Sequence, residues 1–140
     1  NWGCSMSVEM VKTSGLSAPF GMYSHVSRAT GTMIFIAGQV GANPQGEIVG
    51  KGDFAVQMRQ VFANLSAALK SAGASFADVV KFTTYLTSAA DIPKFMATRN
   101  ELYAGIFPHG NYPPNTLLVI SRLVEPELLL EIEAIAMTNG

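Results

Sequence analysis

Charged residues are scarce in this chain of 140 amino acids. Asp, Glu, Lys and Arg make up 14 % of it, against about 25 % in an ordinary soluble domain, and 49 % of the residues are apolar. Nine basic and ten acidic side chains give a formal net charge of −1. That balance argues against the clustered lysines and arginines with which proteins bind nucleic acid, and against an acidic disordered tail. We therefore expect no nucleic-acid partner.

Long hydrophobic runs are also missing. A membrane-spanning helix needs about 20 mainly apolar residues, and the longest apolar stretches, at 33–38, 117–120 and 128–137, are short or carry glutamates. We therefore expect no membrane partner, and we interpret the scarcity of charge as surface buried between copies of the chain in a homo-oligomer. The chain opens without a cationic segment and apolar stretch of the secretory kind, so we expect a cytoplasmic location.

The chain has too few cysteines and histidines for a metal site of the usual kinds. A single cysteine, Cys4, excludes internal disulfides and cysteine-rich metal sites. The two histidines, His25 and His109, are far apart and form no ligand pair. We predict neither a metal nor another cofactor. The length fits one domain, which we place at 8–140, with 1–7 as a disordered tail or a non-native remnant.

Hydrophobic spacing predicts two helices. The first, over 53–72, begins with Asp53 as a cap and ends before Gly73, which fits a left-handed position. Its apolar residues recur every three or four positions and share one face: Phe54, Met58, Val61, Leu65, Leu69 and Ala72. The second begins at Asp91 as a cap, with Pro93 in its first turn, and ends near Phe107.

Short alternating segments predict six strands, at 8–12, 24–29, 33–37, 79–86, 116–123 and 128–137. The order β-β-β-α-β-α-β-β implies two strand–helix–strand crossovers, with antiparallel hairpins at the two ends. The predicted fold class is therefore α+β, a mixed sheet with both helices on one face. Several strands are apolar on both sides, so we expect another subunit to cover the second face.

The segment 128–137 carries two carboxylates inside an apolar strand. Alternation places Leu128, Leu130, Ile132, Ala134 and Ala136 on one face and Leu129, Glu131, Glu133, Ile135 and Met137 on the other. A carboxylate there is costly to desolvate unless it is paired or faces a wet cleft, where a raised pKa would suit a general acid or base. The alternative is a structural ion pair with Arg122, Arg99 or a lysine at a subunit seam. The spacing leaves both open.

Several short motifs follow one another along the chain. They are Ala-Gly-Gln at 37–39, the helix around 60–65, Val-Val-Lys at 79–81, Tyr-Pro at 112–113 before a strand with Arg-Leu at 122–123 after it, and Glu-Ile-Glu-Ala-Ile-Ala at 131–136. In this order they resemble the RidA/YjgF family of enamine/imine deaminases. The resemblance runs from about Ser17 to Met137. It implies a chorismate-mutase-like fold and a homotrimer with three clefts between its subunits. The implied reaction is hydrolysis of a 2-imino or 2-enamino acid to a 2-keto acid and ammonia.

The same resemblance implies the site residues. Glu131 matches the glutamate that places or activates water, and is the predicted catalytic residue. The predicted substrate-binding residues are Tyr23, Ala37, Gly38, Asn115 and Leu117. Tyr23 and Gly38 match the family pattern, but Ala37 stands where the family has serine.

Asn115 stands where the family has the arginine that clamps the substrate carboxylate. An arginine offers a charged, bidentate grip, whereas asparagine offers one neutral NH₂ group and a carbonyl. A neutral hydrogen bond has about half the strength of a charge-assisted one. We therefore expect the exchange to weaken anion binding by several kcal/mol. Strand alternation points Arg122 to the opposite face from Asn115. Arg99, on the second helix, is a candidate replacement.

We therefore favour a deaminase relative that acts on a different small imine, enamine or related metabolite, and not on the standard substrate 2-aminoacrylate. The alternative is a non-catalytic trimer that binds small molecules or serves as an interaction module. A ribonuclease or translation inhibitor is less favoured because the chain has no basic patch interleaved with aromatics. A chorismate mutase is less favoured still, because a dicarboxylate substrate needs arginines.

Overall fold

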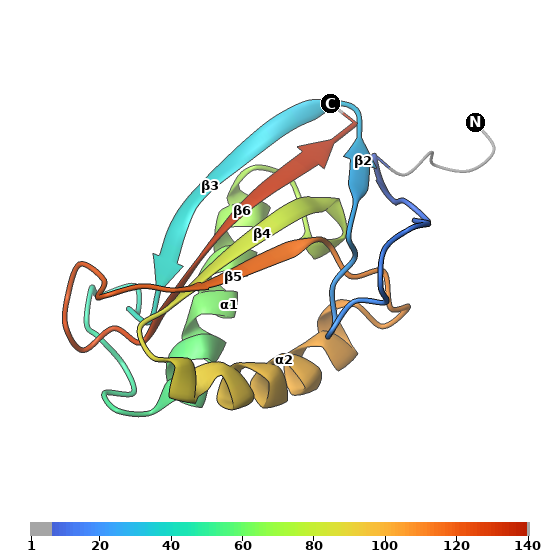
Figure 1. Ribbon diagram of the computed structural model, residues 1–140. Coiled ribbons are helices and arrows are strands. Elements are labelled where there is room, and N and C mark those ends of the chain that lie inside the picture. Colours follow the sequence, from blue (N-terminus) through green and yellow to red (C-terminus); the bar gives the residue numbers. More distant parts are fainter. Residues whose placement is uncertain (1–6, 140) are drawn as a thin grey trace.

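The structure is a computed structural model that describes residues 7–139 (Figure 1). Its strands and α-helices follow the predicted order: β1 (Val8–Met10), β2 (Ser27–Ala29), β3 (Thr32–Val40), α1 (Phe54–Ser71), β4 (Val79–Leu86), α2 (Ile92–Ile106), β5 (Asn115–Val119) and β6 (Leu130–Thr138). Two short 3₁₀ turns, Phe76–Asp78 and Ala89–Asp91, precede β4 and α2. The predicted α+β class is therefore confirmed. No helix within 7–139 is long and apolar enough to cross a membrane.

The predicted tail lies mostly outside the described residues, which begin at Ser7. Ser7 itself is buried, its hydroxyl donates to Asn139 Oδ1 at 2.7 Å, and its carbonyl accepts from the Thr30 amide. Ser7 thus belongs to the packed part of the chain.

The strands form two sheets. β1 and β2 pair antiparallel as a separate ribbon, and the larger sheet has the order β3-β6-β4-β5. β4 and β5 are parallel, as the crossover through α2 requires, and β6 runs antiparallel to both of its neighbours.

The predicted hairpin between the last two strands is wrong, because β6 lies between β3 and β4 and does not pair with β5. The inner face of β6 explains its central place. Four of its residues are almost completely buried there: Leu130, Ile132, Ala134 and Ala136. The short β5 takes the edge, where Leu118 and Val119 stay exposed.

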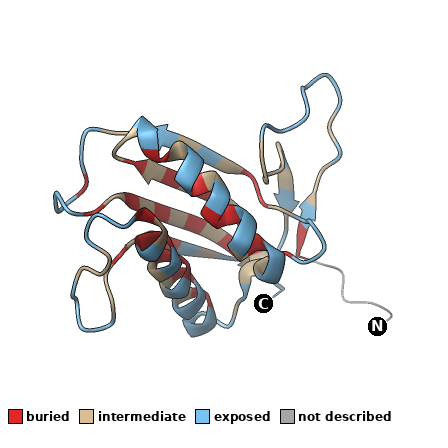
Figure 2. Ribbon diagram, turned by 90° about the horizontal axis from the view of Figure 1, so that it is seen from below, coloured by how far each residue is buried: buried red, intermediate tan, exposed pale blue. Residues whose placement is uncertain are grey.

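Both helices cover one face of the larger sheet, as predicted (Figure 2). Asp53 caps α1 by accepting from the Val56 amide at 3.2 Å, and Gly73 takes the left-handed conformation (φ +73°) after its end. The predicted apolar stripe of α1 is buried except for Ala72, which is exposed because it lies past the last turn. Gln57 joins this stripe and satisfies its amide on the carbonyls of Gly50 and Glu127.

Asp91 does not cap α2, contrary to the prediction. Its backbone is already helical (φ −87°, ψ −5°), so its side chain makes no cap bond and instead contacts Lys94 Nζ at 3.3 Å. The side chain of Ser88 caps the preceding 3₁₀ turn by accepting from the Ala90 amide. Pro93 lies in the first turn of α2, as predicted.

The core between helices and sheet contains Val79, Phe82, Thr84 and Leu86 of β4. Strict alternation along β4 would place Val80 with the other three, but Val79 takes this place. The register with β6 shifts between Val79 and Lys81 and gives β4 one extra residue. The opposite face of the sheet, called the outer face below, is not covered by any helix. Met33 and Phe35 of β3 are 53 % and 70 % exposed there.

Candidate functional site

Glu131 lies on the outer face of β6, half-buried, with Val40 and Tyr85 as its neighbours on the two flanking strands. It meets a β-bulge in β3. Ile36 pairs with Ala134 and Gln39 with Ile132, so two residues, Ala37 and Gly38, stand opposite Glu133. A β-carbon at Gly38 would overlap the carboxylate of Glu131. Only glycine therefore allows this carboxylate to rest against the backbone of β3.

The two glutamates of β6 have different partners. The hydroxyl of Tyr85 donates to Glu133 Oε1 at 2.5 Å, and this bond raises the pKa of Tyr85. Burial, and secondly the charge of Glu133, raise the pKa of Glu131 above its ordinary value. No hydrogen bond or ion pair to the Glu131 carboxylate occurs among residues 7–139. Of these two glutamates, Glu131 is therefore the one whose carboxylate remains available for a proton.

Tyr85 was not predicted as a site residue. Strand alternation places it on one face of β4, but the sequence does not say which strand lies beside it. Its contact with Glu133 depends on the insertion of β6 next to β4, which no local pattern indicates.

Ala37 is exposed beside this carboxylate, and its carbonyl accepts from the side chain of Gln39 at 3.0 Å. The structure thus brings three of the predicted residues together on or beside the outer face: Ala37, Gly38 and Glu131.

Asn115 and Leu117 point to the helix side of the same sheet. Asn115 begins β5 opposite Phe82, and its Oδ1 accepts from the buried hydroxyl of Thr84 at 2.7 Å. Leu117 is half-buried against the core. Because the Asn115 oxygen is already engaged, its NH₂ group is the part that can donate to a ligand.

Tyr23 belongs to the segment between β1 and β2. Its hydroxyl accepts from the Phe20 amide at 3.2 Å, and its ring meets the ring of His25 edge-on, with centroids 5.7 Å apart. Asn115 and Glu131 are therefore not gathered together in a single chain, because Asn115 lies on the other side of the sheet from Glu131. No hydrogen bond joins Tyr23 to Glu131 among residues 7–139.

The two arginines considered at the sequence level have clear positions. Arg122 lies beyond β5, so strand alternation does not apply to it, and its guanidinium donates to the carbonyls of Leu123 and Val124 at 2.9 Å. Arg99 is almost completely buried on α2. Within residues 7–139 neither forms an ion pair with Glu131 or Glu133. The alternative of an ion pair at a subunit seam stays a prediction.

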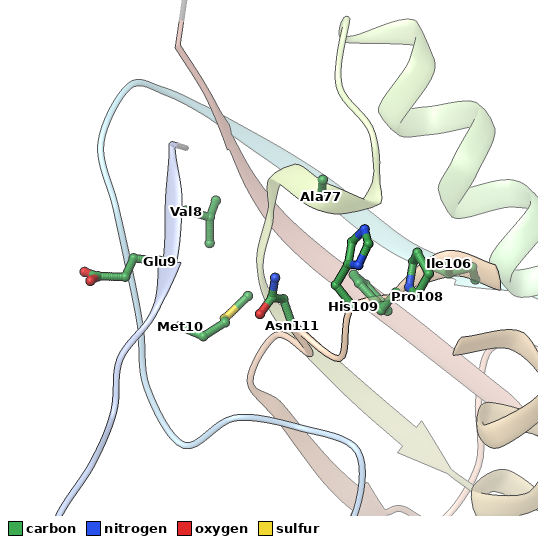
Figure 3. Close-up of a pocket in the computed structure, with 9 residues that line it drawn as sticks. Val8, Glu9, Met10, Ala77, Ile106, Pro108, His109 and Asn111 are labelled. Atoms are coloured by element: carbon green, nitrogen blue, oxygen red, sulfur yellow. The ribbon is translucent and has the colours of Figure 1, made fainter. Parts of the chain in front are cut away.

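A cavity of about 610 Å³ lies elsewhere, between β1 and the end of α2 (Figure 3). Figure 3 shows Met10 pointing toward Asn111, and Glu9 pointing away from them. A second hollow of about 470 Å³ borders Gly38 on the side of α1. Neither is lined by Tyr23, Asn115 or Glu131. Within residues 7–139, no cluster of three or more His, Cys, Asp or Glu side chains is arranged to hold a metal.

Two helices on one face of a mixed four-stranded sheet make this chain a small α+β protein, and proteins of known sequence and structure are similar to it. Residues 15–138 match the family model described as Endoribonuclease L-PSP. The chain is 43 % identical over 129 residues to a RutC family protein of Pyrococcus horikoshii, covering 91 % of this chain and 96 % of that one. It is 36 % identical over 129 residues to the 2-iminobutanoate/2-iminopropanoate deaminase of Rattus norvegicus, covering 92 % and 89 %.

Among solved structures, a protein of unknown function of the conserved Rid family from Yersinia pestis, YyfB, is similar to this chain. The TM-score is 0.83, the identity is 33 %, and the match covers 95 % of this chain and all of that one. The chain therefore belongs to the RidA/YjgF family, whose relatives include reactive intermediate deaminases.

Proposed function

We propose that this protein hydrolyses a small imine or enamine in a cleft between subunits, with Glu131 as the catalytic residue. The observation that carries the proposal is the Glu131 carboxylate, which is held against Gly38 with a raised pKa and without a cationic partner among residues 7–139. The deaminase among the relatives supports the same reaction class.

Imine hydrolysis needs a group that takes a proton and returns it. Glu131 accepts a proton from water while the water oxygen bonds to the imine carbon, and it returns this proton to the nitrogen as the C=N double bond becomes single. Glu131 then takes the remaining proton of the new hydroxyl group and passes it to the amine nitrogen. The carbon–nitrogen bond breaks, its electron pair leaves with ammonia, and the carbonyl group forms. An enamine enters the same path after protonation at carbon. A carboxyl whose pKa is raised by burial suits both proton transfers.

The positions of the other predicted residues support a site built from two chains. Glu131 faces outward and Asn115 faces the helix side, so one chain does not bring them to one substrate. A second copy seated on the exposed outer face would bring its own Tyr23 and Asn115 toward Glu131. The homotrimer implied by the family resemblance provides such clefts.

Asn115 makes the standard substrate unsuitable. Its NH₂ group can donate one neutral hydrogen bond, because Thr84 already donates to its oxygen. A carboxylate beside the imine carbon needs the charged, forked grip of arginine. We therefore propose a substrate that carries no carboxylate directly on the reacting carbon.

The test compares 2-aminoacrylate with enzymatically generated imines of several side chains. We expect turnover of 2-aminoacrylate to be weak or absent beside that of the rat deaminase assayed in parallel. Asn115→Arg should increase it, and Asn111→Arg, on an exposed loop, is the matched control. A wild-type rate on 2-aminoacrylate equal to that of the rat enzyme would contradict the substrate assignment.

The second candidate is a non-catalytic trimer that binds small molecules in these clefts. Ala37 and Asn115 favour it, because both replace side chains that the family uses to hold substrate. Binding of a ligand by the purified protein, with no turnover of any imine in the panel, would place this candidate first.

A further inference from the structure

Arg99 is a buried cation without a negatively charged partner. Its side chain is 2 % exposed, and its Nε is a buried atom that makes no hydrogen bond. Nη2 donates only to the sulfur of Met96, at 2.9 Å. Within residues 7–139 the guanidinium forms no ion pair. Asp91, just before α2, pairs with Lys94, and Glu101 of α2 pairs with Arg59 of α1.

Aromatic rings surround the guanidinium but do not neutralise it. Its Cζ lies 4.9 Å from the ring centroid of Phe95 and 6.0 Å from that of Tyr103. The hydroxyls of Tyr103, Tyr23 and Tyr112 are the titratable groups that act on it. Cation–π attraction offsets part of the desolvation, but an arginine remains charged at any physiological pH.

A buried charge of this kind reduces stability. An apolar side chain of similar volume at the same position is usually neutral or stabilising, because it has no hydration to lose. An arginine at this position is therefore explained by a partner outside the described residues. Such a partner must carry negative charge.

A thin cover separates this cation from the segment that carries Tyr23. A β-carbon at Gly21 would overlap Arg99 Nη2, so the backbone at Gly21 lies directly on the guanidinium. Figure 1 shows the blue segment between β1 and β2 descending to α2. The hydrogen bonds at Gly21 and Phe20 are local to the segment, from Tyr23 N to Gly21 O and from Phe20 N to the Tyr23 hydroxyl, so the cover can move without breaking a sheet.

We propose that Arg99 binds a carboxylate of the cleft ligand when the 20–23 segment moves aside, with the hydroxyl of Tyr23 as a neighbouring donor. The inference rests on the proposed function and refines its substrate class. Asn115 belongs to the sheet and Arg99 to the helix layer that packs on it. A carboxylate at Arg99 is therefore separated from the reacting carbon by intervening atoms, unlike that of 2-aminoacrylate.

The test uses carbonyl acids as unreactive probes of binding. Calorimetry should show that 4-oxopentanoate binds more tightly than its amide and more tightly than pyruvate, whose carboxylate adjoins the carbonyl. Arg99→Met keeps the apolar stem and removes the charge. It should weaken 4-oxopentanoate binding by about 10-fold or more, the equivalent of one charge-assisted hydrogen bond, and leave amide binding unchanged. Arg59→Met, an exposed arginine paired with Glu101, is the matched control.

The variants also separate binding from folding. Arg99→Met should resist urea at least as well as the wild type, because it removes a buried charge. If it fails to fold, Arg99→Lys keeps the charge without the fork and should bind with intermediate affinity. The inference would be overturned if the wild type did not bind 4-oxopentanoate. It would also be overturned if folded Arg99→Met, or Arg99→Lys where Arg99→Met does not fold, bound 4-oxopentanoate with the affinity of the wild type.

These outcomes are distinguishable from failure of the proposed function. Carboxylate binding that depends on Arg99, without turnover of any imine, overturns the hydrolase alone. The carboxylate site alone is overturned by two results together. Uncharged imines are turned over at the same rate by the wild type and by Arg99→Met, and the wild type binds 4-oxopentanoate no more tightly than its amide.

Discussion

Glu131 and Glu133 are separated by one residue on the same face of β6, yet only one of them is engaged by a neighbour. Tyr85 donates to Glu133, while Glu131 rests against the Gly38 backbone. Period-two alternation makes the two glutamates equivalent, so their difference comes from what stands on the flanking strands. We therefore assign the proposed proton-transfer role to Glu131.

Replacement of these two glutamates should affect activity unequally. Once a substrate is found, Glu131→Gln should slow its turnover by roughly 10²-fold or more, because glutamine keeps the shape but cannot accept a proton. Glu133→Gln should act mainly on stability or assembly, since it loses the charged acceptor of Tyr85. The rates of both variants would be compared at matched folding, monitored by circular dichroism. Full activity in Glu131→Gln would make this carboxylate structural.

The raised pKa of Glu131 also predicts how stability depends on pH. Because the folded pKa exceeds the unfolded one, the folded protein holds the extra proton between the two values. The free energy of unfolding therefore decreases as the pH rises from the ordinary pKa through the raised one. Glu131→Gln should be at least as stable as the wild type at pH 7, and this advantage should shrink at pH 4.

Urea unfolding at the two pH values, at equal protein concentration, measures this effect. Glu125→Gln, in the exposed loop before β6, is the control for loss of one negative charge. A variant that is less stable than the wild type at pH 7 would mean that Glu131 is held by a favourable ion pair in the assembled protein.

At the scale of the element, the bulge in β3 determines the position of the Glu131 carboxylate, which we propose to be catalytic. Two residues of β3 oppose one of β6 at this point, so the strand bends where Glu131 needs room. The lack of a side chain at Gly38 provides that room. The Ala-Gly-Gln motif is thus explained by the packing of β3 against β6.

Gly38→Ala should therefore reduce activity without replacing any reacting group. The added methyl group must displace the Glu131 carboxylate, and we expect a loss of at least 10-fold, a fraction of the effect of removing an acid–base group. Gly105→Ala is the control, since a β-carbon there meets open space on α2 and should raise helix stability by about 0.5–1 kcal/mol. Unchanged rates in Gly38→Ala would contradict this role of the bulge.

At the scale of the whole molecule, no helix of the described part of the chain covers the outer face of the sheet. Met33, Phe35 and Leu118 are each about half exposed or more, which is unusual for three large apolar side chains on one sheet. The low charge content of the sequence is consistent with this apolar surface. Further copies of the chain are the cover that we propose.

The protein should therefore have a mass of about 45 kDa in solution, as three chains of 14.9 kDa in a closed ring. Phe35→Glu should shift the mass toward that of one chain, because it places a charge in the buried interface. Ala63→Glu, on the exposed side of α1, is the control and should leave the mass unchanged. A wild-type mass of one chain in light scattering at micromolar concentration would contradict the trimer.

The sequence predicted most of the fold because the signals of its elements are local. The stripe of α1, the cap at Asp53 and the alternation of β6 each follow from neighbouring residues, and all three are confirmed. The predicted cap at Asp91 and the terminal hairpin were wrong because they depend on a competing turn and on a distant strand. For the site, the family resemblance of the sequence indicated candidate residues, among them Glu131 and Gly38.

The sequence by itself determined the class of the protein, the faces of its strands and helices, and the two departures at Ala37 and Asn115. Only the tertiary structure decided that β6 lies between β3 and β4, and hence that Tyr85 engages Glu133 and leaves Glu131 free for a proton. It also decided that Asn115 and Glu131 lie on opposite sides of one sheet, and that Arg99 is buried with no ion pair among residues 7–139. The physical reason is that alternation and capping act between near neighbours, whereas strand order and burial of charge depend on residues far apart in the chain.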